Sequence, residues 1–557
     1  MTAPLRLLVV SDANLDNLTG LLTQDASAPA VAAVSAPFGQ VLPTLADPQA
    51  PVWADGPDVC LVWTHPEAVL PGFAARCRGE SVADQVIADQ VDAYVQLLLS
   101  AATRVRLLLV GTWALPTWQR GYGALDQRPG LGLGYGLLQA NLQLCQGLAG
   151  EPRALVLDVR RWIETVGAAA WSPKLWFLGR IPYHREVFLA AVADIKAALR
   201  GLQGQARKIV IVDLDNTLWG GILGEVGWAG LRVGGHDPVG EAHLALQVAL
   251  KALSRRGVLL AIASRNDEAA ALEALRLHPG MALRPDDFAG WRIDWGDKAA
   301  HIADLLAELN LGPEAAVFVD DTPAERDRVR QALPAVLVPE WPVDPSAAVP
   351  VLLGLRCFDV TTHSREDTGR TRAYVAERQR RQLRCQVPSL EQWLASLELV
   401  VAPEPLGLAQ APRAAQLLNR TNQMTLTGQR ATETELLAWA ATPGTEVWTY
   451  QVRDRFGDAG LTGLACLEQV GGDVWLRQLA LSCRVMGRGV EAAMLHHLSQ
   501  RTAHLGARAL WARPGSTSRN QPCRELLAGL FEAAPNPGIL VWRVPPLLDL
   551  PAHVRLA

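Results

Sequence analysis

Short apolar runs alternate with stretches of helical periodicity over the first two hundred residues. Four of these runs end in polar or turn residues: 5–12, 57–66, 105–112 and 153–159. Between them, residues 82–103 and 133–150 repeat apolar positions at helical spacing. Alternation of strands and helices predicts a parallel α/β sheet.

The same pattern returns more sharply over residues 205–345. The β-branched, apolar runs 208–215, 257–264 and 315–321 each end in Asp or Ser, and residues 241–256 and 298–311 read as helices between them. Ligands of open α/β sheets collect at the carboxyl ends of the strands. The polar residues at these run ends are therefore the first candidates for a site.

A third region begins after a Pro-rich stretch at 339–350 and a charged helical segment around 364–384. It mixes strands with helices, which predicts an α+β fold; its clearest elements are strands at 447–454 and 461–470 and a helix at 489–501. The predicted organisation is an α/β domain at 1–204, a second α/β domain at 205–345, a connecting helical segment at 346–397 and an α+β domain at 398–557.

Length and composition fit this division. The chain has 557 residues, and domains of about 150 residues predict three or four of them. A net charge of −4 gives no electrostatic reason to bind nucleic acid or a membrane surface. The eight Cys show no metal-ligand spacing, and neither a signal-peptide core nor a membrane span is present, so we expect a reduced, cytoplasmic protein.

Two carboxylates follow the first run of the second region. Asp213 and Asp215 are two positions apart, so their side chains start on one face of the strand. Asp320 and Asp321 follow a later run and supply a further carboxylate source. Converging carboxylates repel one another, and Mg²⁺, which prefers oxygen ligands, relieves that repulsion.

Ser264 and Lys298 extend this set. Ser264 ends another run and offers a hydroxyl to an anionic oxygen, and Lys298 begins a predicted helix with a charge able to neutralise a phosphoryl oxygen. Because lysine is rare in this chain, the placement of Lys298 at a helix start supports this interpretation.

This ordered set resembles the haloacid-dehalogenase (HAD) superfamily of phosphotransferases. The segment DLDNTL at 213–218 matches the first HAD motif, and Ser264, Lys298 and the pair Asp320 and Asp321 fall in the order of the other three. The resemblance implies a Rossmann-like domain in which Asp213 attacks phosphorus to form an aspartyl-phosphate. Asp215 would protonate the leaving oxygen and then activate water.

The same resemblance implies roles for the remaining residues. Thr217 and Ser264 would hold phosphoryl oxygens, and Lys298 would neutralise their charge. Mg²⁺ would bind Asp213, the backbone carbonyl of Asp215, and one of the pair Asp320 and Asp321, of which we favour Asp321.

Longer segments resemble the narrower FkbH-like family. They lie across nearly the whole chain, at 213–227, 263–267, 294–302, 318–330, 418–430, 452–463 and 481–491. That family implies an enzyme that takes a three-carbon unit from 1,3-bisphosphoglycerate, removes phosphate and delivers a glyceryl thioester to the phosphopantetheine arm of an acyl carrier protein, for polyketide or related biosynthesis. Arg265 and Thr322 depart mildly from its pattern and leave phosphoryl chemistry intact.

A glycine-rich loop marks the third region. Arg484, Gly487 and Gly489 form an R-x-x-G-x-G pattern before a predicted helix and resemble the pyrophosphate loop of GNAT-type acyltransferases, which implies a site for phosphopantetheine. Cys483 precedes the loop; either its thiolate carries the glyceryl group or it is a small buried strand residue. The charged turn at 454–458 either positions a partner or is a salt-bridged structural turn.

The N-terminal domain resembles the SGNH-hydrolase fold. A Ser-Asp-His hydrolase interpretation has four candidate residues, Ser11, Asp12, Asp158 and His184. A clear motif of such a hydrolase is missing, so an inactive scaffold or docking domain is favoured. Two alternatives to the glyceryl transferase stay open: a stand-alone HAD phosphatase of a small phosphorylated metabolite, and a carrier-protein docking module with a relict site.

Overall fold

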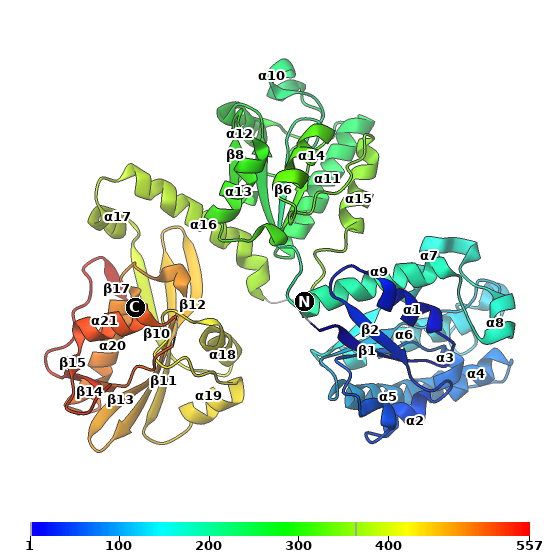
Figure 1. Cartoon of the computed structure of the whole chain (residues 1–557), viewed down its shortest axis with the longest axis horizontal. Coiled ribbons are helices and arrows are strands. Elements are labelled where there is room, and N and C mark those ends of the chain that lie inside the picture. The colour runs from blue at the N-terminus through cyan, green and yellow to red at the C-terminus, as the bar shows by residue number, and fades with distance from the viewer. Residues whose placement is uncertain (1–2, 363–364, 518) are drawn as a thin grey trace. The chain divides into compact units, whose positions relative to one another are not determined.

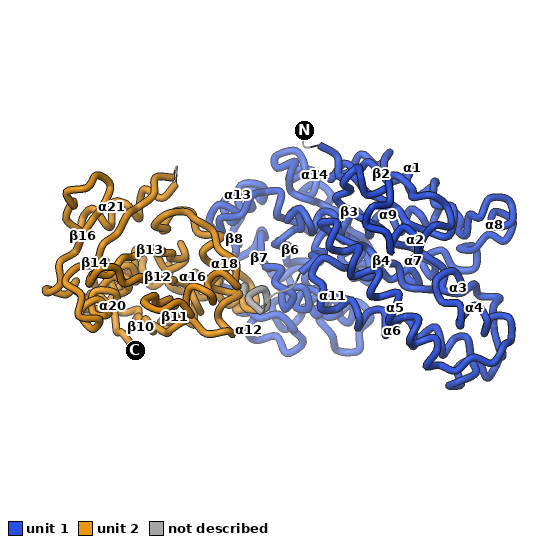
Figure 2. Tube along the Cα trace, turned by 90° about the horizontal axis from the view of Figure 1, so that it is seen from below, with its two compact units in different colours: residues 1–284, 291–368 blue, residues 285–290, 369–557 orange. Residues whose placement is uncertain are grey.

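The computed structural model describes residues 3–362, 365–517 and 519–557. It divides into two compact units: residues 1–284 with 291–368, and residues 285–290 with 369–557 (Figure 2). The first unit holds two sheets and the second holds one. The predicted charged helix begins at residue 364, which lies outside the described residues, and the structure shows α16 at Arg365–Gln386.

The first sheet is parallel, with the order β2-β1-β3-β4-β5. Its strands are β1 (Leu5–Val10), β2 (Val31–Ser35), β3 (Val59–Val62), β4 (Leu107–Gly111) and β5 (Ala154–Leu157). Four of them confirm the predicted runs, whereas β2 was missed because VAAVS is short, and only its first residue, Val31, is buried. The order reverses beside β1, where β2 lies on one side and β3 on the other.

Helices cover both faces of this sheet (Figure 1). Leu7 and Val9 pack toward α1 (Asp16–Gln24) and α9 (Arg185–Leu202), whereas Leu8 and Val10 pack toward α5 (Asp84–Ala102) and α6 (Leu133–Leu148). Because both faces are buried, the strands read as continuous apolar runs instead of alternating ones.

The second sheet has the order β8-β7-β6-β9. Its strands are β6 (Ile209–Val212), β7 (Leu259–Ser264), β8 (Gly290–Ile293) and β9 (Ala316–Val319). The helices that follow the strands are α11 (Pro238–Arg255), α12 (Glu268–Leu277), α13 (Lys298–Glu308) and α14 (Pro323–Ala332). β6 pairs in parallel with β9, and this pairing joins segments more than a hundred residues apart.

The third sheet has eight strands in the order β15-β16-β14-β13-β12-β11-β10-β17 and is mostly antiparallel. Its long central strands are β11 (Thr445–Asp454), β12 (Gly457–Val470) and β13 (Asp473–Leu481), and α20 (Val490–His504) packs on them. The mixture of helices with a mainly antiparallel sheet matches the α+β prediction.

A buried ion-pair network ties α16 to this sheet. Arg380 contacts both oxygens of Asp454 at 2.6 and 2.9 Å, and Glu377 accepts a 2.7 Å hydrogen bond from Arg488. Asp454 and Arg380 are nearly inaccessible to solvent. Asp454 of the charged turn at 454–458 is therefore part of a structural ion-pair network, whereas Arg455 and Asp458 are exposed. In the part of the chain that the structure describes, no helix is both long and apolar enough to cross a bilayer.

Candidate active site

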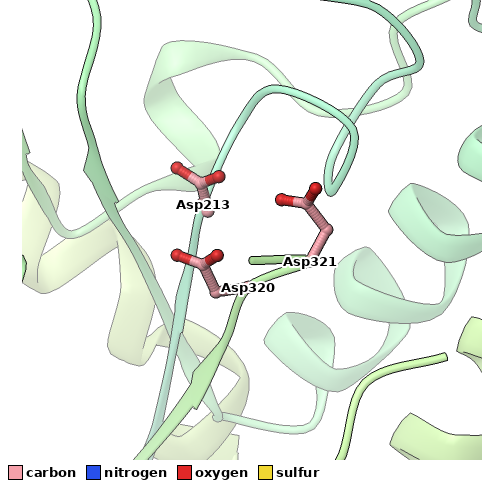
Figure 3. A group of neighbouring side chains, drawn as sticks. All are labelled: Asp213, Asp320 and Asp321. Carbon is pink, nitrogen blue, oxygen red and sulfur yellow. The ribbon is translucent and has the colours of Figure 1, made fainter. Parts of the chain in front are cut away.

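Three carboxylates converge at the carboxyl ends of β6 and β9. The register pairs Val212 with Val319, so the next residues, Asp213 and Asp320, leave adjacent strands at the same level. Asp321 follows directly. Asp213, Asp320 and Asp321 each offer a carboxylate oxygen, and these oxygens lie within 4.8 Å of one another (Figure 3). The parallel pairing of β6 with β9 thus brings Asp213 together with Asp320 and Asp321, whereas the Asp215 carboxylate, which the spacing placed beside Asp213, is not part of this group.

Lys298 is the cation of this group. It is the first residue of α13, is buried, and places Nζ 2.8 Å from Asp213 Oδ1 and 2.6 Å from Asp320 Oδ2. Burial lowers the pKa of Lys298, but the charges of Asp213 and Asp320 outweigh that effect and hold its pKa above the usual value. The ammonium therefore stays charged and neutralises part of the carboxylate cluster.

One ammonium does not balance three carboxylates. Burial raises the pKa of Asp213 above its usual range, and the neighbouring Asp320 adds to this, whereas Lys298 opposes it. Burial and Asp320 likewise raise the pKa of Asp321. A hard divalent cation such as Mg²⁺ removes this excess negative charge, and the oxygen donors present are those it prefers. The side chains therefore fit a Mg²⁺ site.

Thr217 and Ser264 border the carboxylates. The hydroxyl of Thr217 donates to Asp321 Oδ1 at 3.3 Å and accepts a 3.0 Å hydrogen bond from the Asp321 N–H. Ser264 ends β7, is buried, and hydrogen-bonds the Asp213 carboxylate through its hydroxyl. Both hydroxyls therefore border the carboxylate cluster, and their contact with phosphoryl oxygens stays a prediction.

The Asp215 carboxylate lies apart from this group and is held by three donors. Oδ1 accepts hydrogen bonds from the indole of Trp219 at 2.8 Å and from the N–H of Leu223 at 3.1 Å, and Oδ2 accepts one from the amide of Asn266 at 3.0 Å. Trp219 and Asn266 are buried. The sequence assigned no role to either; the signal available was only that Trp219 directly follows the segment 213–218 and that Asn266 lies two residues after Ser264.

Two side chains of α11 hold the loop that follows β6. His243 hydrogen-bonds the Thr217 carbonyl through Nδ1 at 3.0 Å, and Gln247 donates to the Leu218 carbonyl at 3.0 Å. Asn216 has a left-handed backbone with φ of 53° and accepts a hydrogen bond from the Gly221 N–H through its side chain. Asn tolerates this conformation better than most residues, so the sharp turn between Asp215 and Thr217 is built into the sequence.

The predicted residues of the glycine loop lie in the second unit. Cys483 is exposed at the start of a short 3-10 turn, Cys483–Val485, and Arg484 is exposed beside it. Gly487 and Gly489 have left-handed φ angles of 73° and 89°. The Gly487 N–H donates to Glu491 at 2.6 Å, so this loop amide is already paired within the chain.

The residues suggested for the N-terminal domain are not brought together as a triad. His184 and Asp158 are exposed at the starts of α9 and α7 (Val159–Val166), and among the described residues no hydrogen bond joins their side chains to Ser11. Asp12 instead pairs with His65, which the sequence did not single out. The Ser11 hydroxyl donates to the Trp63 carbonyl at 2.6 Å.

Comparison with solved structures gives a similar fold for part of this chain. No protein-family model matches this chain, and no curated protein does either. Among solved structures, the N-terminal part of the protein BF1531 from Bacteroides fragilis, which contains a phosphatase domain complexed with Mg, is similar with a TM-score of 0.59 at 23% identity. The likeness covers 64% of this chain and 95% of that chain, and it shows a shared fold.

Acetyltransferase structures also match at low scores. They include the ribosomal-protein-S18-alanine N-acetyltransferase from Escherichia coli, with a TM-score of 0.20, 18% identity, and coverage of 26% of this chain and 94% of that one. The IAA acetyltransferase from Bacillus cereus has a TM-score of 0.18, 12% identity, and coverage of 26% and 99%. Scores this low carry no argument about the second unit.

The carboxylate cluster predicts stabilisation by Mg²⁺. At 100 times its Kd, a ligand that binds only the folded state adds about 2.7 kcal/mol to the free energy of unfolding, which corresponds to a rise in Tm of about 5 °C. Thermal unfolding in Mg²⁺ and in EDTA should show this difference for the natural chain. Asp321→Asn should abolish it, whereas Asp304→Asn, an exposed change on α13, should retain it. An unchanged Tm difference in Asp321→Asn would remove Asp321 from the site.

Proposed function

We propose that this chain is a Mg²⁺-dependent phosphotransferase of the HAD type with Asp213 as its nucleophile. The observation that carries this is the meeting of Asp213, Asp320 and Asp321 around the buried ammonium of Lys298. The fold shared with a Mg-complexed phosphatase domain supports the same assignment.

Each residue of the site has its own step in the proposed reaction. An Asp213 oxygen attacks phosphorus as the bond to the leaving oxygen breaks, and Asp215 supplies the proton that the leaving oxygen takes. Asp215 then accepts a proton from the water that cleaves the aspartyl-phosphate. Lys298, Thr217 and Ser264 stabilise the phosphoryl oxygens, and Mg²⁺, when bound, supplies further charge neutralisation.

Trp219 and Asn266 are the positioning residues of this scheme. They bind opposite oxygens of Asp215, so the carboxylate plane is fixed before substrate arrives. Fixed geometry matters because proton transfer requires the donor within hydrogen-bond reach of the reacting oxygen. One lone pair of Oδ2 stays available for the leaving group or water, since Oδ2 accepts only the Asn266 hydrogen bond among the described residues.

We further propose that the substrate is 1,3-bisphosphoglycerate. The Cys483 thiolate attacks the C1 acyl carbon and displaces the C1 phosphate, the Asp213 site hydrolyses the C3 phosphate ester, and the thiol of a carrier protein then takes the glyceryl group as the Cys483 thiolate leaves. The motifs resembling the FkbH-like family support the substrate and the partner. Exposure of Cys483 supports its role, because a carrier thiol must reach the acyl carbon. No inserted domain covers the site loop, which holds only α10 (Leu223–Val226) and a 3-10 turn, Trp228–Gly230, before α11.

A stand-alone phosphatase of a small phosphorylated metabolite is the second candidate. It uses the same aspartates and requires nothing from the second unit. The pairing of the Gly487 N–H with Glu491 and of Arg488 with Glu377 favours it, because these loop groups are then engaged within the chain. A docking module with a relict site is disfavoured by the complete set of carboxylates, hydroxyls and lysine.

The nucleophile is tested by Asp213→Asn. An amide cannot form the aspartyl-phosphate, so phosphate release from a model phosphoryl substrate should fall by at least about 10³-fold. Release is measured in the presence of Mg²⁺, with Asp304→Asn as the matched surface control. Retention of activity in Asp213→Asn would refute the proposed reaction.

The positioning role is tested by Trp219→Phe and Asn266→Ala. Each removes one hydrogen bond to Asp215, and kcat should fall about tenfold or more with a smaller change in KM. Because water activation suffers, acid-quenched samples should contain more phosphoenzyme than the natural chain. Trp291→Phe, which removes an indole hydrogen bond to Glu268 at 3.0 Å, is the control. Reduced kcat without phosphoenzyme accumulation would indicate a structural role only.

The thioester step is tested by Cys483→Ala. The chain is incubated with 1,3-bisphosphoglycerate and a phosphopantetheinylated carrier protein, and the mass of the carrier is measured. Glyceryl loading should disappear in Cys483→Ala while phosphate release from a model substrate persists. Loading at the natural rate in Cys483→Ala would exclude Cys483 as the acyl carrier, and phosphate release without any loading by the natural chain would favour the stand-alone phosphatase.

A further inference from the structure

Arg265 stands at the edge of the candidate active site. It directly follows Ser264, the last residue of β7, whose hydroxyl hydrogen-bonds the Asp213 carboxylate. The sheet order β8-β7-β6-β9 places β7 beside β6, the strand that leads to Asp213. Arg265 therefore leaves the sheet at the same edge as the proposed nucleophile.

Two contacts hold the Arg265 guanidinium across this edge. Nη1 lies 2.8 Å from Glu325 Oε1 on α14, the helix that follows β9, and Nε donates to the Gly296 carbonyl at 3.3 Å. Gly296 follows β8 and lies two residues before Lys298. Because β6 lies between β7 and β9, a side chain that reaches from the end of β7 to α14 spans the end of β6. The guanidinium thus joins loops on both sides of Asp213.

The outer edge of this guanidinium faces solvent. The Arg265 side chain is 47% exposed and that of Glu325 only 14%, so the carboxylate supports the guanidinium from the protein side. Among the described residues, no hydrogen bond engages Nη2 of Arg265. An arginine held in this way keeps N–H donors available for the oxygens of a planar ligand group.

The site has few other groups that could recognise the carbon chain of a substrate. The loop after β6 contains only α10 and one 3-10 turn, and Lys298 already contacts two carboxylates of the cluster. Arg328 lies beside the same loop as Gly296, but it donates to both carboxylate oxygens of Asp297, at 3.3 and 3.0 Å. Arg265, by contrast, has a donor to spare at the open side of the site.

We infer that Arg265 is a specificity-determining residue, which binds the oxygens of a carboxyl-derived group at the far end of the phosphorylated carbon chain. The inference rests on the proposed phosphatase reaction at Asp213 and names the part of the substrate that this site reads besides phosphate. A free carboxylate accepts two parallel N–H bonds from a guanidinium, and the carbonyl oxygen of an ester or thioester accepts one. A hydroxymethyl group in the same place offers neither a charge nor a carbonyl oxygen.

Three matched phosphate esters test this in the full chain with Mg²⁺. They are 3-phosphoglycerate, which ends in a carboxylate, its methyl ester, which ends in a neutral carbonyl group, and glycerol 3-phosphate, which ends in a hydroxymethyl group. Phosphate release by the natural chain should have the lowest KM for 3-phosphoglycerate and the highest for glycerol 3-phosphate. Arg265→Met should raise KM about tenfold for 3-phosphoglycerate and by a smaller factor for the methyl ester, and it should leave glycerol 3-phosphate unchanged.

The kinetic pattern separates recognition from a structural role. Because Arg265 binds away from the reacting atoms, kcat should change little in Arg265→Met. Arg265→Lys, which keeps the charge and loses the planar fork, should restore part of the KM for 3-phosphoglycerate. Arg328→Met is the matched control, since it removes an arginine whose contacts to Asp297 are complete, and it should leave all three KM values unchanged.

Equilibrium binding gives a measurement that needs no turnover. In the Asp213→Asn chain, titration calorimetry with 3-phosphoglycerate should give a Kd that rises about tenfold when Arg265→Met is added. Glycerol 3-phosphate should bind equally with and without Arg265→Met. Loss of activity toward glycerol 3-phosphate in Arg265→Met would indicate a disturbed site, in which case the KM values of Arg265→Lys decide.

A natural chain that does not prefer 3-phosphoglycerate to glycerol 3-phosphate would overturn the inference. The same holds if Arg265→Met changes KM equally for all three esters or for none of them. Absence of Mg²⁺-dependent release from every ester would instead refute the proposed phosphatase reaction, and the two calorimetric Kd values would still decide whether Arg265 binds the carboxylate.

Discussion

The chemistry of this protein depends on a charge imbalance held at the end of a strand pair. Three carboxylates share one small volume with a single buried ammonium, and desolvation makes that imbalance costly unless another cation enters. Lys298 contacts two of the carboxylates directly, which leaves Asp321 less well compensated. A site with this residual negative charge is suited to a divalent cation, whose oxygen-ligand preference the three carboxylates meet.

The imbalance is tolerated because the surrounding backbone is fixed. Arg326 is buried and donates to the carbonyls of both Asp320 and Asp321, at 2.9 and 2.8 Å. His243 and Gln247 hold two carbonyls of the loop after β6 from the opposite side. Rigid support of this kind places a catalytic group more accurately than a mobile loop does. The proposed nucleophile, its proposed acid–base partner and the proposed cation ligands therefore hold their positions without substrate.

The two parallel sheets share one arrangement of side chains at their strand ends. In each, an aspartate at or next to the end of a central strand meets a partner that the neighbouring strand or following helix supplies: Asp12 meets His65 across β1 and β3, and Asp213 meets Lys298 and Asp320 beside β6 and β9. The partners differ in kind. Lys298 joins further carboxylates around Asp213, whereas His65 forms a single pair with Asp12. In the third sheet, by contrast, the buried charges of Arg380 and Asp454 form a structural ion pair.

The sequence by itself determined the strands that lead to Asp213, Ser264 and Asp320 and the helix that begins near Lys298. It also determined that carboxylates stand at those strand ends, because apolar runs and their polar termini are local features. The strands β2 and β8 were missed, since each has only four or five residues and is only partly buried. Only the tertiary structure decided that Trp219 and Asn266 hold Asp215 and that Asp12 pairs with His65 rather than with His184. Asn266 and His65 lie more than fifty residues from their carboxylates, and strand register alone brings such groups within hydrogen-bond distance.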